Sequence, residues 1–252
     1  MAWSKKLLKY LGVLAFWMLV WKAASLLVGE NLRLFLPPPE QVALRLCSLL
    51  GEGAFWSAVG ATLLRIFLGF VLGAVGGVLC GLLSANSTVA DALLSPVMKL
   101  VRAVPVVSFI ILAFLFIHVD HLPVFISCLM VLPLVWQTTH DGLRRTDRAL
   151  LEMAGVYRIG FWKTLLYIRF PGAMPGIITG CVSALGLAWK SGVAAEVLCT
   201  PELSMGHAIY AAKANLAFDE VYAVTLTIVL LSLGLEGLFK SVSRSVWGGE
   251  AT

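Results

Sequence analysis

Long apolar runs limit what this chain can fold into. Six stretches are each about as long as a bilayer is thick, because roughly 20 helical residues cover the roughly 30 Å hydrocarbon core. A spanning segment must satisfy its backbone polar groups in lipid, and none of these runs alternates as a barrel strand does. The sequence therefore predicts an all-α polytopic membrane protein with six transmembrane helices, over residues 7–28, 59–83, 98–117, 122–139, 176–198 and 221–242.

The composition excludes a soluble fold. Hydrophobic residues make up 60% of the 252 residues and charged residues only 13%, which leaves too few polar side chains to cover a globular surface. The net charge of +5 does not indicate nucleic acid, because the basic residues lie at the ends of apolar runs rather than on one face. We expect the apolar surface to contact the lipid bilayer.

The basic residues also set the expected orientation. With the N-terminus inside, thirteen Lys and Arg residues fall in cytoplasmic segments, against Arg33, Arg45 and Lys213 outside. The positive-inside rule then places both termini in the cytoplasm. Lys5, Lys6 and Lys9 before the first run are also typical of a signal peptide, but that run is long enough to be an uncleaved span.

We divide the chain into four segments on this basis. Three prolines precede a short amphipathic stretch, 40–50, which we expect at the membrane interface. The segments are residues 1–35, the first transmembrane helix and the start of an external loop; 36–58, the rest of that loop; 59–243, the transmembrane core; and 244–252, a cytoplasmic tail.

The second span carries a stripe of small residues. Such a stripe lets a neighbouring helix approach closely in a membrane, so we expect it to pack against another span. The stripe consists of Gly69, Gly73, Gly76, Gly77 and Gly81.

One cytoplasmic segment, 140–175, is too long to be a simple connector. Its apolar residues recur at steps of three or four with charged residues between them, which predicts amphipathic helix, and Pro171 and Pro175 should end that helix. A short helix with an exposed apolar face suits either a groove on a cytoplasmic protein or the lipid headgroups. The residues alone leave both alternatives open.

This segment resembles the coupling loop of permease subunits from binding-protein-dependent ABC importers. The family pattern is Glu-Ala-Ala, three residues, Gly, nine residues, Ile, any residue, Leu, Pro. Here Met153 stands for the first Ala, Phe170 for the Leu and Arg158 for the Gly, with Gly160 two residues later. The residues at the required offsets are Glu152, Ala154, Ile168 and Pro171.

Other stretches resemble the branch of that family that transports sulfonates, taurine, nitrate and thiamine precursors. They cover about four fifths of the chain, in the order found in that branch. The stretches are LPPPEQV from Leu36, TLLRIFLGF from Thr62, VRAVPVVSF from Val101, FPGAMPGIITG from Phe170 and LGLAWKSGVAAEV from Leu185.

The resemblance implies a type I importer permease in the bacterial inner membrane. It implies a homodimer, two cytoplasmic ATP-binding subunits docked on the coupling loops, and an external or periplasmic binding protein that delivers a small solute. The solute would be anionic or a vitamin precursor. The sequence has no GxxxxGK[ST] motif, so we expect ATP and Mg²⁺ on the partner subunits, no cofactor on this chain and no enzymatic activity of its own.

Lys190 is the residue least expected in a span. It lies about 21 Å into the helix counted from Gly176, where a charge is costly and needs a function or a partner. It would either line the translocation path and attract an anion, or pair or snorkel as a structural residue. Three neighbours, Trp189, Ser191 and Glu196, join it as candidate path residues, although such a Trp also packs in cores.

Three other functions fit less well. An intramembrane enzyme would need a nucleophile with a base, and no GxSxG or His lies within a span. A channel or secondary transporter would show repeated halves, which are absent from the sequence. The turn with His118, Asp120 and His121 has too few ligands for a metal, and the five cysteines have no metal-binding spacing, so we expect no metal or catalytic site.

Overall fold

The protein is described here by a computed structural model covering residues 2–29 and 34–247, with side chains for 12–29 and 34–242. These residues form helices and loops without strands, as the sequence predicts. The helices are α1 (Ala2–Leu27), α2 (Pro39–Leu50), α3 (Gly53–Asn86), α4 (Thr88–Ala103), α5 (Val106–Phe114), α6 (Leu122–Arg144), α7 (Arg148–Val156), α8 (Phe161–Thr164), the π-helical turn η2 (Leu165–Arg169), α9 (Phe170–Cys199), α10 (Met205–Ala214) and α11 (Phe218–Trp247).

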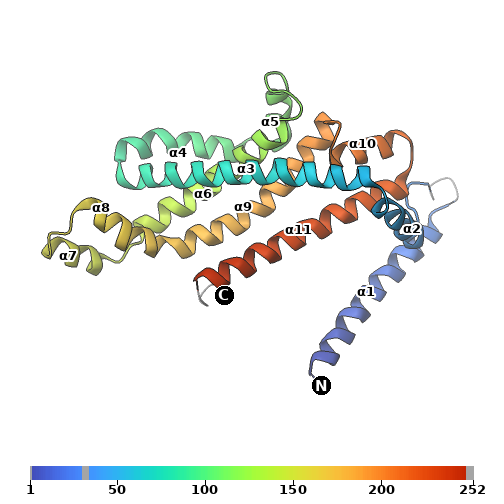
Figure 1. The fold of residues 1–252 in the computed structure, drawn as a ribbon, viewed down its shortest axis with the longest axis horizontal. Helices are drawn as coiled ribbons and strands as arrows, with labels where there is room; N and C mark the ends of the chain where they lie inside the picture. The colour runs from blue at the N-terminus through green and yellow to red at the C-terminus, as the bar shows by residue number, and fades with distance from the viewer. Residues whose placement is uncertain (1, 30–33, 248–252) are drawn as a thin grey trace.

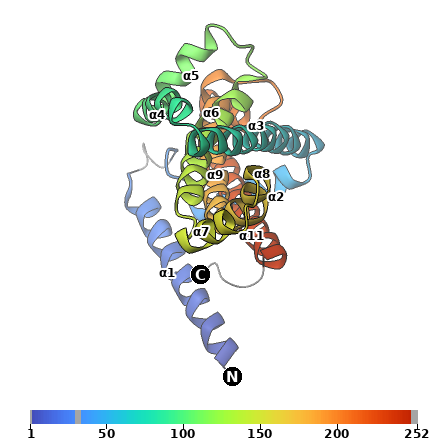
Figure 2. The same cartoon turned by 90° about the vertical axis from the view of Figure 1, so that its left-hand side faces the viewer.

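The centre of the fold is a three-helix unit of α3, α6 and α9. Its core lies where Ile66, Phe70, Val135 and Ala188 meet, all at most 5% exposed. Helix α11 packs on α9, and α2 and α10 gather at one end of the long axis, with α7 and α8 at the other (Figure 1). Helix α1 leaves the bundle in both views (Figures 1 and 2).

The predicted glycine stripe packs against α6. A methyl group at Gly69, Gly73 or Gly77 would lie 2.5, 2.7 or 2.8 Å from a backbone carbonyl oxygen of α6, closer than any carbon side chain allows. Gly81 is equally close to Thr139, whereas Gly76 lies beside the seam with 3.4 Å to its nearest neighbour. The stripe therefore lets two spanning helices touch through their backbones.

The prediction of a continuous third span over 98–117 is wrong. The chain forms two helices there, α4 and α5, whose axes differ by 100°. The break falls at Val104 and Pro105 because the proline has no N–H to donate and its ring forces the preceding residue out of the helical region, with Val104 at φ −80°, ψ 133°.

The number of spans is smaller than the predicted six in the described residues. Four helices there are long and apolar enough to cross a bilayer, and counting the bent α4–α5 pair as one span gives five. The apolar part of α1 within those residues, Gly12–Leu27, is shorter than a typical span. The six-span prediction is therefore not confirmed.

The prediction that Pro171 and Pro175 end a helix is also wrong. Residues Phe161–Cys199 run as one helical rod of 39 residues through α8, η2 and α9. In η2 the turn widens, so that the Phe170 N–H donates to the carbonyl of Leu165, five residues back. A widened turn next to Pro171 leaves room for the proline ring, so the helix continues.

The glycine seam gives a testable expectation. Gly77→Val should lower the unfolding midpoint of the purified protein in detergent, since forcing a side chain into packed backbone costs about 1–3 kcal/mol. Gly76→Val is the matched control on the same turn and should change the midpoint much less. Equal midpoints for the two variants would contradict the seam.

Candidate functional site

The coupling segment is a helical hairpin rather than one helix. Helix α7 begins at Asp147, whose Oδ1 accepts a hydrogen bond from the Ala149 N–H at 2.9 Å. Helix α8 begins after the turn at Tyr157–Gly160. Glu152 is exposed on α7, and Ala154 is buried at 3% exposure on the side facing the hairpin. The segment is thus amphipathic, as predicted, but divided by a turn.

Arg158 occupies the turn in a left-handed conformation, with φ 50°. The Ile159 N–H donates to the carbonyl of Ala154 at 2.8 Å, and the Arg158 N–H donates to that of Gly155 at 3.0 Å. This pair of bonds is the Schellman ending of a helix, which usually carries glycine at the position that Arg158 fills. Gly160, at φ −63°, does not take over that position. The turn therefore forms without the family glycine.

The hairpin exposes apolar side chains around its turn. Val156, Tyr157 and Trp162 are 80%, 75% and 72% exposed. Large exposed apolar groups on a short capped hairpin make this surface a candidate for contact with a protein or with lipid headgroups. Its place at one end of the long axis keeps it clear of the bundle (Figure 1).

Arg169 fixes the base of the hairpin, and the sequence analysis missed this residue. Its Nη1 donates to Oδ1 of Asn86 at the end of α3, and its Nη2 donates to the carbonyl of Leu143 at 3.4 Å. The neighbouring Ile168 is half-buried, while Pro171 is exposed in the first turn of α9. Three helix ends therefore meet at Arg169. The only feature of the sequence that could have pointed to Arg169 is its position next to the motif residue Ile168.

The candidate path residues on α9 separate into buried and exposed positions. Trp189 is 3% exposed, and its indole N–H donates to the carbonyl of Ile228 on α11 at 3.1 Å. Ser191 is 4% exposed and donates to the carbonyl of Ala188 at 3.2 Å. Lys190 is exposed. The structure thus brings Trp189 and Ser191 into the protein interior and leaves only Lys190 pointing away from it.

Glu196 is fully buried at the junction of three helices, α3, α9 and α10. Its Oε2 accepts hydrogen bonds from the Thr62 hydroxyl at 2.8 Å and from the Gly206 N–H at 3.4 Å. Its Oε1 lies 3.6 Å from Nη1 of Arg65. The other terminal nitrogen of Arg65, Nη2, lies 3.2 Å from Oδ1 of Asp120. The carboxylate thus holds the N-terminus of α10 against α3 and α9. The N–H groups at that end have no acceptor within the helix, so they favour a negative charge.

The same helix end is capped twice more. The Met205 N–H donates to the Thr62 hydroxyl at 3.0 Å, and the His207 N–H donates to the Ser204 hydroxyl at 2.9 Å. Three amides in the first turn of α10 therefore have side-chain acceptors, Glu196 being one of them. This arrangement gives Glu196 a positioning role for the loops at that end of the fold.

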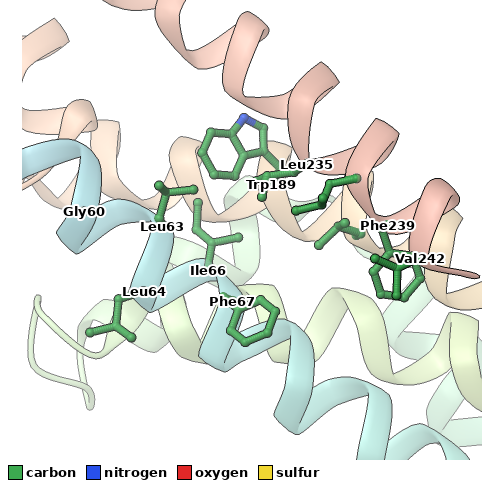
Figure 3. A pocket seen from close by; sticks show the side chains of 11 residues that line it. Gly60, Leu63, Leu64, Ile66, Phe67, Trp189, Leu235, Phe239 and Val242 are labelled. Carbon is green, nitrogen blue, oxygen red and sulfur yellow. The ribbon is translucent and has the colours of Figure 1, made fainter. Parts of the chain in front are cut away.

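An apolar cavity of about 500 Å³ lies between α3, α9 and α11, and Trp189 of α9 is among the side chains that line it (Figure 3). Leu63 and Phe67 line it from α3, and Leu235 and Phe239 line it from α11. It offers apolar contact and no charged group among its lining residues.

The turn before α6 holds His118 close to Asp120, with 3.4 Å between Nδ1 and Oδ2. Across the described residues no three His, Cys, Asp or Glu side chains gather in a way that would hold a metal ion. All five cysteines are free: Cys47 is exposed, Cys199 is buried and the other three are half-buried.

The Glu196 network predicts a stability difference. Glu196→Leu should lower the thermal midpoint in detergent, because it strands buried donors of Thr62 and Gly206 at a cost of about 1–3 kcal/mol. Glu196→Gln keeps an acceptor and should lose less. Glu202→Leu, at an exposed glutamate of the adjacent loop, is the control. A midpoint for Glu196→Leu equal to that of the control would refute the network.

Comparisons with known proteins agree with this geometry. At 27% identity the chain is similar to the taurine transport system permease protein of Escherichia coli (strain K12), over 98% of this chain and 92% of that protein. It is 30% identical to the putative aliphatic sulfonates transport permease protein of the same organism, over 84% and 80%.

Solved structures share the fold. One is an amino acid ABC transporter, at a TM-score of 0.65 and 14% identity, covering 81% of this chain and 96% of that chain. Another is the MetNI methionine ABC transporter in an inward-facing conformation, at 0.61 and 17%, covering 80% and 98%. The family model for the binding-protein-dependent transport system inner membrane component matches residues 77–248. The chain therefore belongs to this family and is a permease subunit of an ABC importer.

Proposed function

We propose that this permease carries a small anionic solute of the sulfonate class along the exposed face of α9. The observation that carries the proposal is the contrast between spanning helices. Exposed residues on α3 and α11 are mainly large and apolar, such as Leu72 and Leu230. The exposed residues of α9 include Thr179, Ser183 and Lys190 beside Leu187 and Leu198. A polar, charged face is costly in lipid, which supports a path or a protein interface there.

The hydroxyls on this face need no external partner. Thr179 donates to the carbonyl of Pro175 at 2.9 Å, and Ser183 donates to that of Thr179 at 3.2 Å. Lys190 differs, because an ammonium in a span needs an anion, water or a route to the membrane surface. The taurine and sulfonate names of the similar permeases supply an anion class that fits it. A vitamin precursor is the alternative solute.

The hairpin of α7 and α8 is the proposed docking element for an ATP-binding subunit. The hairpin is preorganised, because its first helix is capped and its turn is hydrogen-bonded. Its exposed apolar end suits a groove on a protein. Arg145, Arg148 and Lys163 lie at the same end, which supports a cytoplasmic location by the positive-inside rule. The lipid headgroups are the alternative contact.

The remaining parts of the importer are proposed as follows. Two copies of this chain form the membrane-spanning homodimer in the bacterial inner membrane, with both termini in the cytoplasm. Two partner subunits bind ATP and Mg²⁺ and hydrolyse the nucleotide, so this chain holds no cofactor. An external binding protein delivers the solute to the opposite end. Closing of the ATP-binding subunits moves the hairpins together and shifts the permease between two states.

The docking surface makes a first prediction. Val156→Glu should abolish copurification with the ATP-binding subunits, because it places a charge in an apolar contact. Glu152→Lys and Arg158→Glu should lower solute uptake less than Val156→Glu does, since an exposed ion pair contributes about 0–1 kcal/mol. Arg145→Glu, outside the hairpin tip, is the control.

Membrane yield should stay unchanged in all four variants. Copurification of the Val156→Glu variant at the wild-type level would overturn docking on this surface. If that variant instead loses only its affinity for anionic lipid vesicles, the headgroup alternative is correct.

The path makes a second prediction. Lys190→Met should lower binding-protein-dependent uptake of taurine into proteoliposomes about tenfold or more, because a hydrogen bond to a charged group contributes about 1.5–3 kcal/mol. Lys190→Arg should keep most of the uptake. Lys213→Met, at an exposed lysine of α10, is the matched control. Wild-type uptake by Lys190→Met would remove Lys190 from the path.

A further inference from the structure

Helix α4 is held to the bundle by polar contacts more than by burial. Of its 16 residues only Met98 is buried, and α5 beyond the bend likewise buries only Ile110. The 23 residues of α6 include eleven buried ones. Elements with few buried apolar contacts are the ones that move most easily in a folded protein. The contacts that locate α4 therefore decide how it moves.

A charged cluster joins the first turn of α4 to the last turns of α6. Asp91 Oδ1 lies 3.4 Å from Nε2 of His140, and Asp91 Oδ2 lies 3.7 Å from Nη2 of Arg144. The other ring nitrogen of His140 is 3.1 Å from Oδ1 of Asp141. Trp136 stacks on the His140 ring at 5.5 Å between centroids. His140 is thereby fixed from three sides.

A second polar contact joins the far end of α4 to the same helix. Nη1 of Arg102, in the last turn of α4, donates to Oε1 of Gln137. Helix α4 is therefore tied to α6 near both of its ends. The chain bends on either side of α4, at the extended residue Ser87 and at the break before Pro105.

The cluster occupies the stem of the coupling hairpin. Arg144 is the last residue of α6, and only Arg145, Thr146 and Asp147 separate it from α7. A displacement of α7 thus reaches His140 and Arg144 within one helical turn. Asp91 receives that displacement at the start of α4, and the bent α4–α5 pair leads from there to the loop before α6, which projects from the side of the bundle (Figure 1).

We propose that Asp91, His140 and Arg144 form a junction that passes the movement of the coupling hairpin to α4 and α5. They are positioning residues, because they act through α4 and contact neither solute nor nucleotide. The inference rests on the proposed docking of ATP-binding subunits to the hairpin. It goes further by naming the part of the bundle that moves when the hairpin moves. That part is the weakly buried pair α4–α5, which the Asp91 cluster links to the hairpin, rather than the tightly packed α3, α6 and α9.

The experiment measures solute transported per ATP hydrolysed. The assembled importer, with its ATP-binding subunits and binding protein, is reconstituted in proteoliposomes with taurine as the probe. Asp91→Asn should lower the transport-to-hydrolysis ratio about fivefold, the lower end of typical coupling energies, with unchanged complex yield. Asp141→Asn is the control, since Asp141 touches His140 from the same helix and does not link α4.

A charge exchange separates coupling from simple stabilisation. Asp91→Arg alone should uncouple hydrolysis from transport, and the double variant Asp91→Arg with Arg144→Asp should recover most of the ratio. An unchanged ratio in Asp91→Asn, or no recovery in the double variant, would overturn the junction, as would loss of the assembled complex in the single variants. Failure of the wild-type chain to transport with ATP would instead refute the proposed function.

Discussion

The backbone contact between α3 and α6 is the constraint on which the rest of the structure depends. Four glycines spaced by four residues bring these helices within touching distance, and no other residue fits at Gly69, Gly73 or Gly77. In lipid the hydrophobic effect does little to hold helices together, so close packing has to do it. Helix α9 then packs on α6 through Gly180, where a methyl group would lie 2.2 Å from the Thr138 hydroxyl. The three helices form one rigid body.

Polar contacts join the two ends of this three-helix unit to the neighbouring segments. At one end, Glu196 ties α9 to α3 and to the first turn of α10. At the other, Arg169 ties the base of the hairpin to α3 and α6. Helices α8 and α9 belong to one continuous helical rod, so no loop separates this half of the hairpin from the Glu196 end. The bent pair α4–α5 is not part of that rod, and polar contacts of Asp91 and Arg102 join it to α6.

The sequence predicted the helical class, the glycine contact and the amphipathic helix of the cytoplasmic segment, because each depends on local spacing. It failed where neighbouring backbone decides the outcome. Pro105 stands at a helix break, whereas Pro171 follows a π-helical turn and lies within a continuous helical rod. The sequence groups Trp189 and Glu196 with Lys190 as candidate path residues, and it could not foresee that the first two are buried against α11 and α10, because burial is a tertiary property. Adjacent residues of a helix point in directions about 100° apart, so residues next to Lys190 in the sequence need not lie on the same face of α9.

Arg158 shows how a motif residue can be replaced without loss of the structure it specifies. A left-handed conformation costs a non-glycine residue about 1–2 kcal/mol, which explains why the family pattern places glycine there. In this chain the turn is fixed by two backbone hydrogen bonds, to Ala154 and Gly155, and by the burial of Ala154. These contacts offset the strain. The arginine then adds a positive charge at the tip of the hairpin, next to apolar groups of the proposed docking surface, where glycine would offer none.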